Sequence, residues 1–491
     1  MVETELKFRV PPGGAAALKR ALATTTAQTT RLRAVYFDTP ERHLAQAGMA
    51  LRLRLEGRRW VQTLKGSAGL MARAEHEVQL PAQRGEPALD LQRHAEAPVG
   101  QALLALLAAR GLAAADLRVL YRTDVTRVHR LLRFQGALFE LAHDRGHLLA
   151  DARRHEVDEL EIELKSGPPQ ALPVLAERWV ARFGLWWDPR TKSEMGTRLA
   201  LGLAQVPARR AQAAWPGEDA TPGALWTATL QSALLQALAN AAECADGSGS
   251  AEHLHQLRVG LRRLRAALRL FAPWCAEPGA ARALDAAWRE PFAALGALRD
   301  ADVRRLALAP RLAEAGAPAF DWPTDEAAPA DLPTWLCSTA FQRLLLQSLA
   351  LSLAPAADLP PLAEAARALL RPAWRAIRHD AAGFAEADDA TQHRLRKRLK
   401  RLRYALEAVQ PLFPRKATRR FLSAAARALD ALGALNDAGS ALERLRPQAQ
   451  RQPGAWFAVG FLAARREALL AEAAAALAFL LRTPRPWRGQ G

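Results

Sequence analysis

The sequence has little cysteine, little tyrosine and no long apolar segment, and each scarcity excludes a class of protein. Its 491 residues include three widely separated cysteines, which argues against a disulfide framework or a zinc knuckle and suits a reducing cytosol. The longest apolar run, Ala468–Leu481, contains Glu472 and is too short and too polar to cross a bilayer. The charged start, Met1–Val10, is unlike a secretory signal, so we expect a cytoplasmic protein.

Lysine is also rare, since eight of the 68 basic residues are lysines and the others are arginines. The net charge is nevertheless +18 and both halves of the chain are basic, so we expect polyanionic partners. The three tyrosines and the scattered tryptophans do not provide the stacking platform typical of proteins that bind single-stranded nucleic acid. Nucleic acid is therefore disfavoured, and charge alone leaves phospholipid and phosphate polymers as alternatives.

The pattern of the sequence changes near residue 204. Residues 1–203 contain alternating charged and apolar residues, typical of strands, whereas residues 225–485 are rich in Ala, Leu and Arg at helical spacing. Residues 204–224 hold prolines and glycines without a period and are predicted to be a linker. We therefore predict an α+β multidomain fold, with an antiparallel β domain followed by an all-α domain. The predicted strands are Glu3–Val10, Leu51–Glu56, Trp60–Lys65, Arg73–Leu80, Thr123–Leu132, Ala137–Ala142 and Val157–Leu164, with helices at Ala102–Arg110 and Ala171–Phe183 and a turn at Asp144–Gly146.

The helical half contains an internal repeat. The segment His255–Leu268 aligns without gaps on His393–Leu406, and each copy is followed at a similar distance by a Leu-Gly-Ala-Leu block. Two matching blocks at matched spacing indicate duplication. We predict two homologous helical bundles, at about residues 250–350 and 390–485, related by a pseudo-twofold axis.

Glu3, Glu5 and Lys7 alternate, so a strand would place all three on one face. Other predicted strands likewise give one face to charges of both signs. Such faces are solvated if they point outward, or they line the interior of a closed barrel. A charged interior requires bound counter-charges: carboxylates suit Mg²⁺ or Mn²⁺, and lysine and arginine suit phosphate oxygens.

The ordered motifs of this half resemble those of the CYTH domain. They are E-T-E-L-K at 3–7, V-Y-F-D-T at 35–39, L-R-L-R at 51–54, T-L-K-G at 63–66, E-L-E-I-E-L at 159–164 and T-K-S-E at 191–194. This is the superfamily of triphosphate tunnel metalloenzymes, which includes class IV adenylate cyclases, thiamine triphosphatases and inorganic triphosphatases. The resemblance covers residues 1–203 and implies an eight-stranded antiparallel barrel with peripheral helices, whose tunnel binds a triphosphate and divalent ions, Mg²⁺ or Mn²⁺.

The resemblance also implies roles for individual residues. The metal ligands would be Glu3, Glu5, Glu161 and Glu163. The catalytic residues would be Glu3, Glu5 and Lys7, with Glu3 or Glu5 orienting the attacking water. The residues that bind the substrate phosphates would be Lys7, Arg52, Arg54, Lys65, Arg122 and Lys192, and Arg73 is a further candidate because it fits the inward face of a charged strand.

Basic residues of the two repeated segments recur at spacings of three and four, which places them in one stripe along each helix. The stripe is either a solvated face or one side of a groove for a linear polyanion, and its recurrence at the same register favours the groove. These blocks resemble the CHAD domain, a helical domain that is often fused to CYTH and associated with inorganic polyphosphate. The resemblance covers residues 225–485 and implies the polyphosphate-binding residues His255, Arg258, Arg262, Arg265, Arg343, His393, Arg396, Lys400 and Arg403.

We therefore predict a metal-dependent inorganic triphosphatase that cleaves tripolyphosphate to diphosphate and phosphate and carries a helical polyphosphate-binding domain. One alternative is a non-catalytic protein that binds polyphosphate on granules. Another is a thiamine triphosphatase or an adenylate cyclase that uses the same tunnel. The paired glutamates favour an enzyme, because an anion-binding protein has no use for four acids in its pocket.

Overall fold

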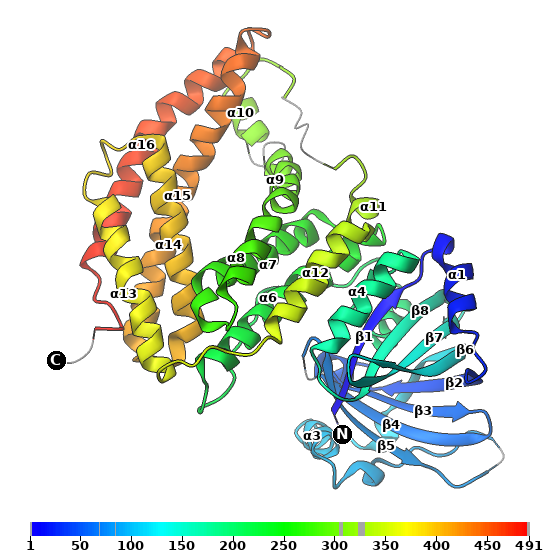
Figure 1. Ribbon diagram of the computed structural model, residues 1–491. Coiled ribbons are helices and arrows are strands. Elements are labelled where there is room, and N and C mark those ends of the chain that lie inside the picture. The colour runs from blue at the N-terminus through cyan, green and yellow to red at the C-terminus, as the bar shows by residue number, and fades with distance from the viewer. Residues whose placement is uncertain (1, 68, 84, 304–307, 323–328, 489–491) are drawn as a thin grey trace. The chain divides into compact units, whose positions relative to one another are not determined.

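The computed structural model describes residues 2–67, 69–83, 85–303, 308–322 and 329–488 (Figure 1). The chain divides into two compact units. The first contains Met1–Arg210 together with two segments of the helical half, Leu234–Leu257 and Asp331–Leu353. The second contains Ala211–Ala233, Arg258–Ala330 and Ala354–Gly491.

The first unit is built on an antiparallel sheet, which in the described residues has nine strands in the order β5-β4-β3-β2-β6-β7-β8-β1-β9. The row of strands curls round, so that residues 2–4 of β1, the strand next to β9, also pair with residues 72–74 of β5. The strands are β1 Val2–Arg9, β2 Gln28–Asp38, β3 Ala50–Glu56, β4 Arg59–Ser67, β5 Ala72–Gln79, β6 Arg118–Phe134, β7 Ala137–Ala150, β8 Arg153–Ser166 and β9 Trp186–Trp187.

Short helices cover the outer face of this sheet. Leu51 and Leu64 are fully buried there against Val99 and Leu103 of α3. Helices α4 and α12 pack side by side along another flank (Figure 1). The α-helices that belong wholly to this unit are α1 Pro12–Leu22, α2 His43–Gln46, α3 Pro98–Ala108, α4 Ala171–Phe183, α5 Lys192–Ala200, α11 Leu332–Cys337 and α12 Thr339–Ser352.

Helix α5 covers an apolar part of the inner face. Its Met195 packs in one cluster with Leu32, Val125, Leu148 and Val157. Two residues further along β6 and β8, on the same faces of these strands, the side chains are charged. The inner face is therefore divided into an apolar part beneath α5 and a charged part beside it.

The second unit is helical. Helix α14 buries Leu395, Leu399 and Leu402, which recur every three or four residues as a core-facing stripe requires. The ring centroids of Trp374 on α13 and Phe421 on α15 lie 5.3 Å apart. The helices of the second half of the chain are α6 Pro222–Ala245, α7 Ala251–Leu270, α8 Pro278–Ala287, α9 Arg289–Val303, α10 Ala309–Glu314, α13 Leu362–Ala381, α14 Asp389–Val409, α15 Arg415–Ala449 and α16 Ala455–Arg482.

The predicted α+β organisation, with an antiparallel sheet followed by helices, is confirmed. The predicted sheet had eight strands, and the structure adds a ninth because Trp186–Trp187 pairs with the end of β1. Within the described part of the chain, no helix combines the length and the apolar character needed to span a membrane.

Candidate functional site

The acidic residues of β1 point into the space that the curved sheet encloses. Glu3 and Glu5 alternate with Leu6, which is 1% exposed on the opposite face. Nζ of Lys65 on β4 lies 2.7 Å from Oε2 of Glu3, although β5 separates β4 from β1 in the sheet. A contact across an intervening strand requires both side chains to lie on the inner face. The charges of these strands thus face one another and not the solvent.

Glu3 and Glu75 form a hydrogen-bonded pair that shares the ammonium of Lys65. Burial raises the pKa of Glu3, but the charge of Lys65 and the hydrogen bond from Glu75 outweigh burial and lower this pKa to about 2. The pKa of Glu75 is raised to about 8. Burial is the largest cause, and the hydrogen bond with Glu3 and the charge of Glu3 add to it, against the opposing charge of Lys65. At neutral pH one member of the pair is therefore an anion and the other is a neutral hydrogen-bond donor.

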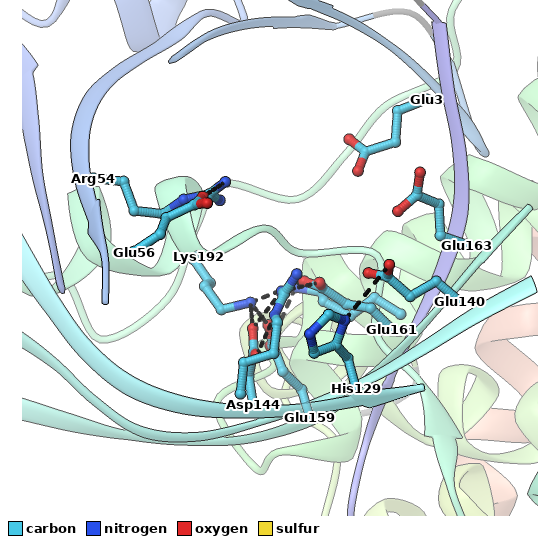
Figure 2. Close-up of polar contacts among 12 residues, drawn as sticks. Glu3, Arg54, Glu56, His129, Glu140, Asp144, Glu159, Glu161, Glu163 and Lys192 are labelled. Carbon is cyan, nitrogen blue, oxygen red and sulfur yellow. Dashed lines mark hydrogen bonds and ion pairs between the residues drawn. The ribbon is translucent and has the colours of Figure 1, made fainter. Parts of the chain in front are cut away.

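Lys192, near the start of α5, reaches into a second acidic cluster (Figure 2). Its Nζ lies 2.7 Å from Asp144 and 2.8 Å from Glu161, and it also contacts Glu159. Arg127 adds contacts of 2.7 Å to Asp144 and 2.5 Å to Glu161. Burial would raise the pKa of Glu161, yet Lys192 and Arg127 hold it well below its ordinary range. The carboxylates of this cluster lie within 4.8 Å of one another, as in a metal site, but an ammonium group contacts all three.

Two arginines of β3 provide buried donors on the same inner face. Nη2 of Arg52 lies 3.7 Å from Glu77, and Nη2 of Arg54 lies 3.2 Å from the same carboxylate oxygen. The Nε atoms of both arginines are buried and have no hydrogen-bond partner among the described residues. Burial and the charge of Arg52 lower the pKa of Arg54. These donors suit the oxygens of a phosphate chain.

The residues near Glu163 fit a hard divalent cation. Figure 2 shows the carboxylates of Glu3 and Glu163 turned toward each other. Burial raises the pKa of Glu163, and the charges of Glu3 and Glu140 add to this rise against the opposing effect of Lys165. A cation between these acids would relieve their repulsion, and carboxylate oxygens are the ligands that Mg²⁺ and Mn²⁺ prefer. Glu3 and Glu163 are thus the best placed of the predicted metal ligands.

The structure brings most of the predicted tunnel residues onto the inner face. Arg122 is different: its side chain is half-exposed, and its Nη1 lies 2.9 Å from Glu86. On β6 its neighbours Tyr121 and Thr123 are buried, so alternation turns Arg122 to the other face. The side chain of Arg73 lies outside the described residues. The predicted residues that face inward are Glu3, Glu5, Lys7, Arg52, Arg54, Lys65, Glu161, Glu163 and Lys192.

Sequence reasoning missed Arg127 and placed a turn at Asp144–Gly146. The turn is wrong, because β7 continues through these residues and Asp144 is fully buried opposite Arg127. The glycine serves close packing: a Cβ atom on Gly146 would lie 2.1 Å from the carbonyl oxygen of Asp124 on β6. Alternation from Thr123 along the predicted strand was the available signal for Arg127.

In the helical half, each copy of the repeat places an arginine of its first block over the glycine of its second block. Nη1 of Arg258 donates to the carbonyl oxygens of Leu295, at 3.1 Å, and of Gly296, at 2.7 Å. A Cβ atom on Gly296 would lie 3.4 Å from Nη2 of Arg258, and one on Gly433 would lie 3.6 Å from Nη2 of Arg396. The duplicated blocks therefore encode one shared packing arrangement.

Basic residues of α7 and α14 gather in a cluster of cations. Burial, followed by the charges of Arg396 and Arg262, lowers the pKa of Lys400 to about 7, against the opposing effect of Asp437. The Nε atoms of Arg262, Arg396 and Arg403 are buried without a hydrogen-bond partner in the described part of the chain. An anion bound here would restore the charge balance.

Other predicted polyphosphate-binding residues have protein partners. Nε of Arg265 lies 2.9 Å from Asp285, and Nδ1 of His393 lies 2.5 Å from the amide oxygen of Asn436. Arg343 belongs to the first unit, where its Nε lies 2.7 Å from a carboxylate oxygen of Glu177 on α4.

His255 also lies in a segment of the first unit. The structure therefore assigns Arg343 and His255 to the unit that contains the sheet, and the other predicted polyphosphate-binding residues to the second unit. Arg343 faces α4 because α12 packs along that helix.

Comparison with known proteins gives two domain matches. Residues 1–184 match the CYTH domain, and residues 228–446 match the CHAD domain. An inorganic triphosphatase of Haemophilus influenzae is 29% identical over 201 residues, which are 40% of this chain and 54% of that protein. The chain thus spans about half the length of this curated relative.

Solved structures are similar to each half. The CHAD domain of the plant Ricinus communis is 30% identical, with a TM-score of 0.44, and the match covers 56% of this chain and 98% of that one. A candidate adenylyl cyclase from Hippeastrum, described as having a dominant triphosphatase activity, is 19% identical with a TM-score of 0.29. That match covers 42% of this chain and 98% of the Hippeastrum chain.

Proposed function

Since this chain joins a CYTH domain to a CHAD domain, we propose that it is a divalent-metal-dependent inorganic triphosphatase that cleaves tripolyphosphate to diphosphate and phosphate. One observation carries the proposal: the inner face of the sheet holds buried cations and an ionised carboxylate side by side. Arg52, Arg54 and Lys65 supply donors for phosphate oxygens, and Glu3 remains an anion at neutral pH. An inner face built only to bind anions would gain nothing from Glu3.

The division of labour follows from charge. The basic side chains bind and orient the triphosphate and neutralise its non-bridging oxygens. Glu3 accepts a hydrogen bond from a water molecule and so orients it for attack on the terminal phosphorus. Glu75, which keeps its proton, donates to Glu3 and fixes the direction of its carboxylate. Glu3 and Glu163 would hold a divalent ion, which would supply Lewis-acid stabilisation of the charge that develops on the phosphoryl group.

The test is phosphate release from tripolyphosphate, thiamine triphosphate and ATP, each with Mg²⁺ or Mn²⁺. We expect tripolyphosphate to be the best substrate, and we expect Glu3→Gln/Glu5→Gln to abolish its cleavage while the circular dichroism spectrum stays that of the wild type. Normal turnover by this double variant would overturn the assignment of the site.

The cluster of Arg262, Arg396 and Lys400 supports a second role, which is the binding of polyphosphate by the helical domain. Such binding would hold the enzyme on polyphosphate granules in the cytoplasm. We expect Arg396→Ala/Lys400→Ala to weaken the binding of long-chain polyphosphate at least about tenfold and to leave tripolyphosphate turnover unchanged. Unaltered polyphosphate affinity would mean that these residues form an ordinary solvated face.

A further inference from the structure

A buried ion cluster lies just before α5. Arg190 is 4% exposed, and its Nε and Nη2 each lie 2.9 Å from an oxygen of Asp188. Its Nη1 lies 2.9 Å from Glu243 and 2.5 Å from Asp246, at the end of α6. All of these residues belong to the first unit. The guanidinium thus connects the segment before α5 to a helix that is distant in sequence.

Such a cluster fixes geometry more than it adds stability. Glu243 is fully buried, and taking opposite charges out of water offsets most of their attraction. The planar guanidinium can satisfy several carboxylate oxygens in one orientation only. Asp188 is tied to the sheet as well, because its N–H donates to the carbonyl oxygen of Lys7 at 3.0 Å. The sheet therefore holds the chain at Asp188, and the acids at the end of α6 hold it at Arg190.

Arg190, which is held in this way, lies two residues before Lys192, the lysine that enters the acidic cluster. Thr191 caps α5, since its hydroxyl accepts from the N–H of Glu194, whose carboxylate in turn accepts from the N–H of Thr191. Lys192 follows, with its Nζ in contact with Asp144 and Glu161. The placement of this ammonium therefore depends on where α5 begins.

We propose that Arg190 is a positioning residue for the triphosphatase site, and that Glu243 and Asp246 at the end of α6 act through it to place Lys192. The inference rests on the proposed function of the tunnel. Residues 228–446 match the CHAD domain, so part of that matched segment completes the phosphate site of the CYTH domain. The CYTH match and this segment of the CHAD match then depend on each other within the first compact unit.

A kinetic double-mutant cycle in the full-length protein tests this inference. Arg190→Gln should raise KM for tripolyphosphate about tenfold, and Arg190→Lys should restore part of the loss. Lys192→Met alone should also raise KM. If Arg190 acts through Lys192, adding Arg190→Gln to Lys192→Met should change KM by less than about twofold. The same increase in KM in both backgrounds would overturn the proposal, because independent structural effects add.

A second variant keeps the test decisive if Arg190→Gln does not fold. Glu243→Gln/Asp246→Asn preserves side-chain volume and should reproduce the increase in KM with kcat little changed. Arg31→Gln is the matched control, because it removes a largely exposed ion pair with Asp124 and should leave KM unchanged. An unchanged KM in the Glu243→Gln/Asp246→Asn variant would overturn the inference while wild-type turnover still supported the proposed function. If the wild type did not cleave tripolyphosphate, the proposed function itself would be wrong.

Discussion

Glu75 donates a hydrogen bond to Glu3, and the two carboxyl groups have pKa values of about 8 and about 2. Both residues lie on the inner face within reach of the ammonium of Lys65. Two chemically identical groups thus hold opposite protonation states at neutral pH. The arrangement leads to predictions about both activity and stability.

Lys65→Met should move the acid limb of the pH–rate profile to higher pH. Without the ammonium, burial is opposed only by the hydrogen bond from Glu75, so the pKa of Glu3 rises. Glu3 then loses its charge earlier as the pH falls, and the limb should move by at least about one pH unit. Initial rates of tripolyphosphate cleavage across the acid range measure this shift. Arg31→Gln should leave the limb where it is, and an unshifted limb in Lys65→Met would show that Glu3 is not the titrating group.

Glu75→Gln should remove a pH dependence of stability. The pKa of Glu75 is raised from 4.5 in the unfolded chain to about 8 in the folded protein. The folded state therefore binds more protons between these values, and wild-type stability falls as the pH rises through this window. Free energies of unfolding by urea at about pH 5 and about pH 8 should converge in the variant. An equal fall in both proteins would place the responsible proton elsewhere.

Gly196→Ala should displace α5. A Cβ atom on Gly196 would lie 2.2 to 2.5 Å from ring atoms of Tyr121, which is buried and stacked on Tyr36. We expect a loss of about 1–3 kcal/mol of folding free energy, together with a higher KM because Lys192 starts the same helix. Gly13→Ala is the control, since that helical glycine has no atom within 4 Å and should be neutral or stabilising. Equal stabilities for the two variants would contradict the close packing of α5.

The binding of polyphosphate should depend on the protonation of Lys400. Its pKa of about 7 means that the amine loses its charge as the pH rises from 6 to 8, so affinity should fall several-fold over this range. Lys400→Arg keeps its charge and should flatten the dependence. Fluorescence anisotropy with labelled long-chain polyphosphate at both pH values measures the difference. Parallel curves for the two proteins would remove Lys400 from the binding site.

The sequence predicted most strands of the first unit because charged and apolar residues alternate along them. It missed β2 as a strand, although the motif at residues 35–39 lies at its end. The predicted strand that corresponds to β7 ended at Ala142, because Asp144 and Gly146 are turn-forming residues. In the structure β7 continues through them: Asp144 is buried, and Gly146 allows close packing against β6. Local propensity was overridden by contacts with β6.

The prediction of the site depended on the same alternation. It failed for contacts between residues that come from different helices and strands. A resemblance of motifs identified Lys192, but no local pattern links Arg190 to Glu243, which lies 53 positions away. Likewise, the resemblance to the CHAD domain implied that Arg343 binds polyphosphate, yet the packing of α12 on α4 pairs it with Glu177. Long-range partners of this kind are decided by tertiary structure.

The junction between β1 and β5 has three residue pairs, the fewest of any pairing among strands β1 to β8 in the described residues. An edge strand with unpaired N–H and C=O groups is a template for association with other chains. If the junction opens on mild heating, amide hydrogens of residues 2–4 and 72–74 would exchange before those of the long β6–β7 hairpin. Aggregation of this protein would then begin at the ends of β1 and β5, and a substitution that reinforces this junction would delay it.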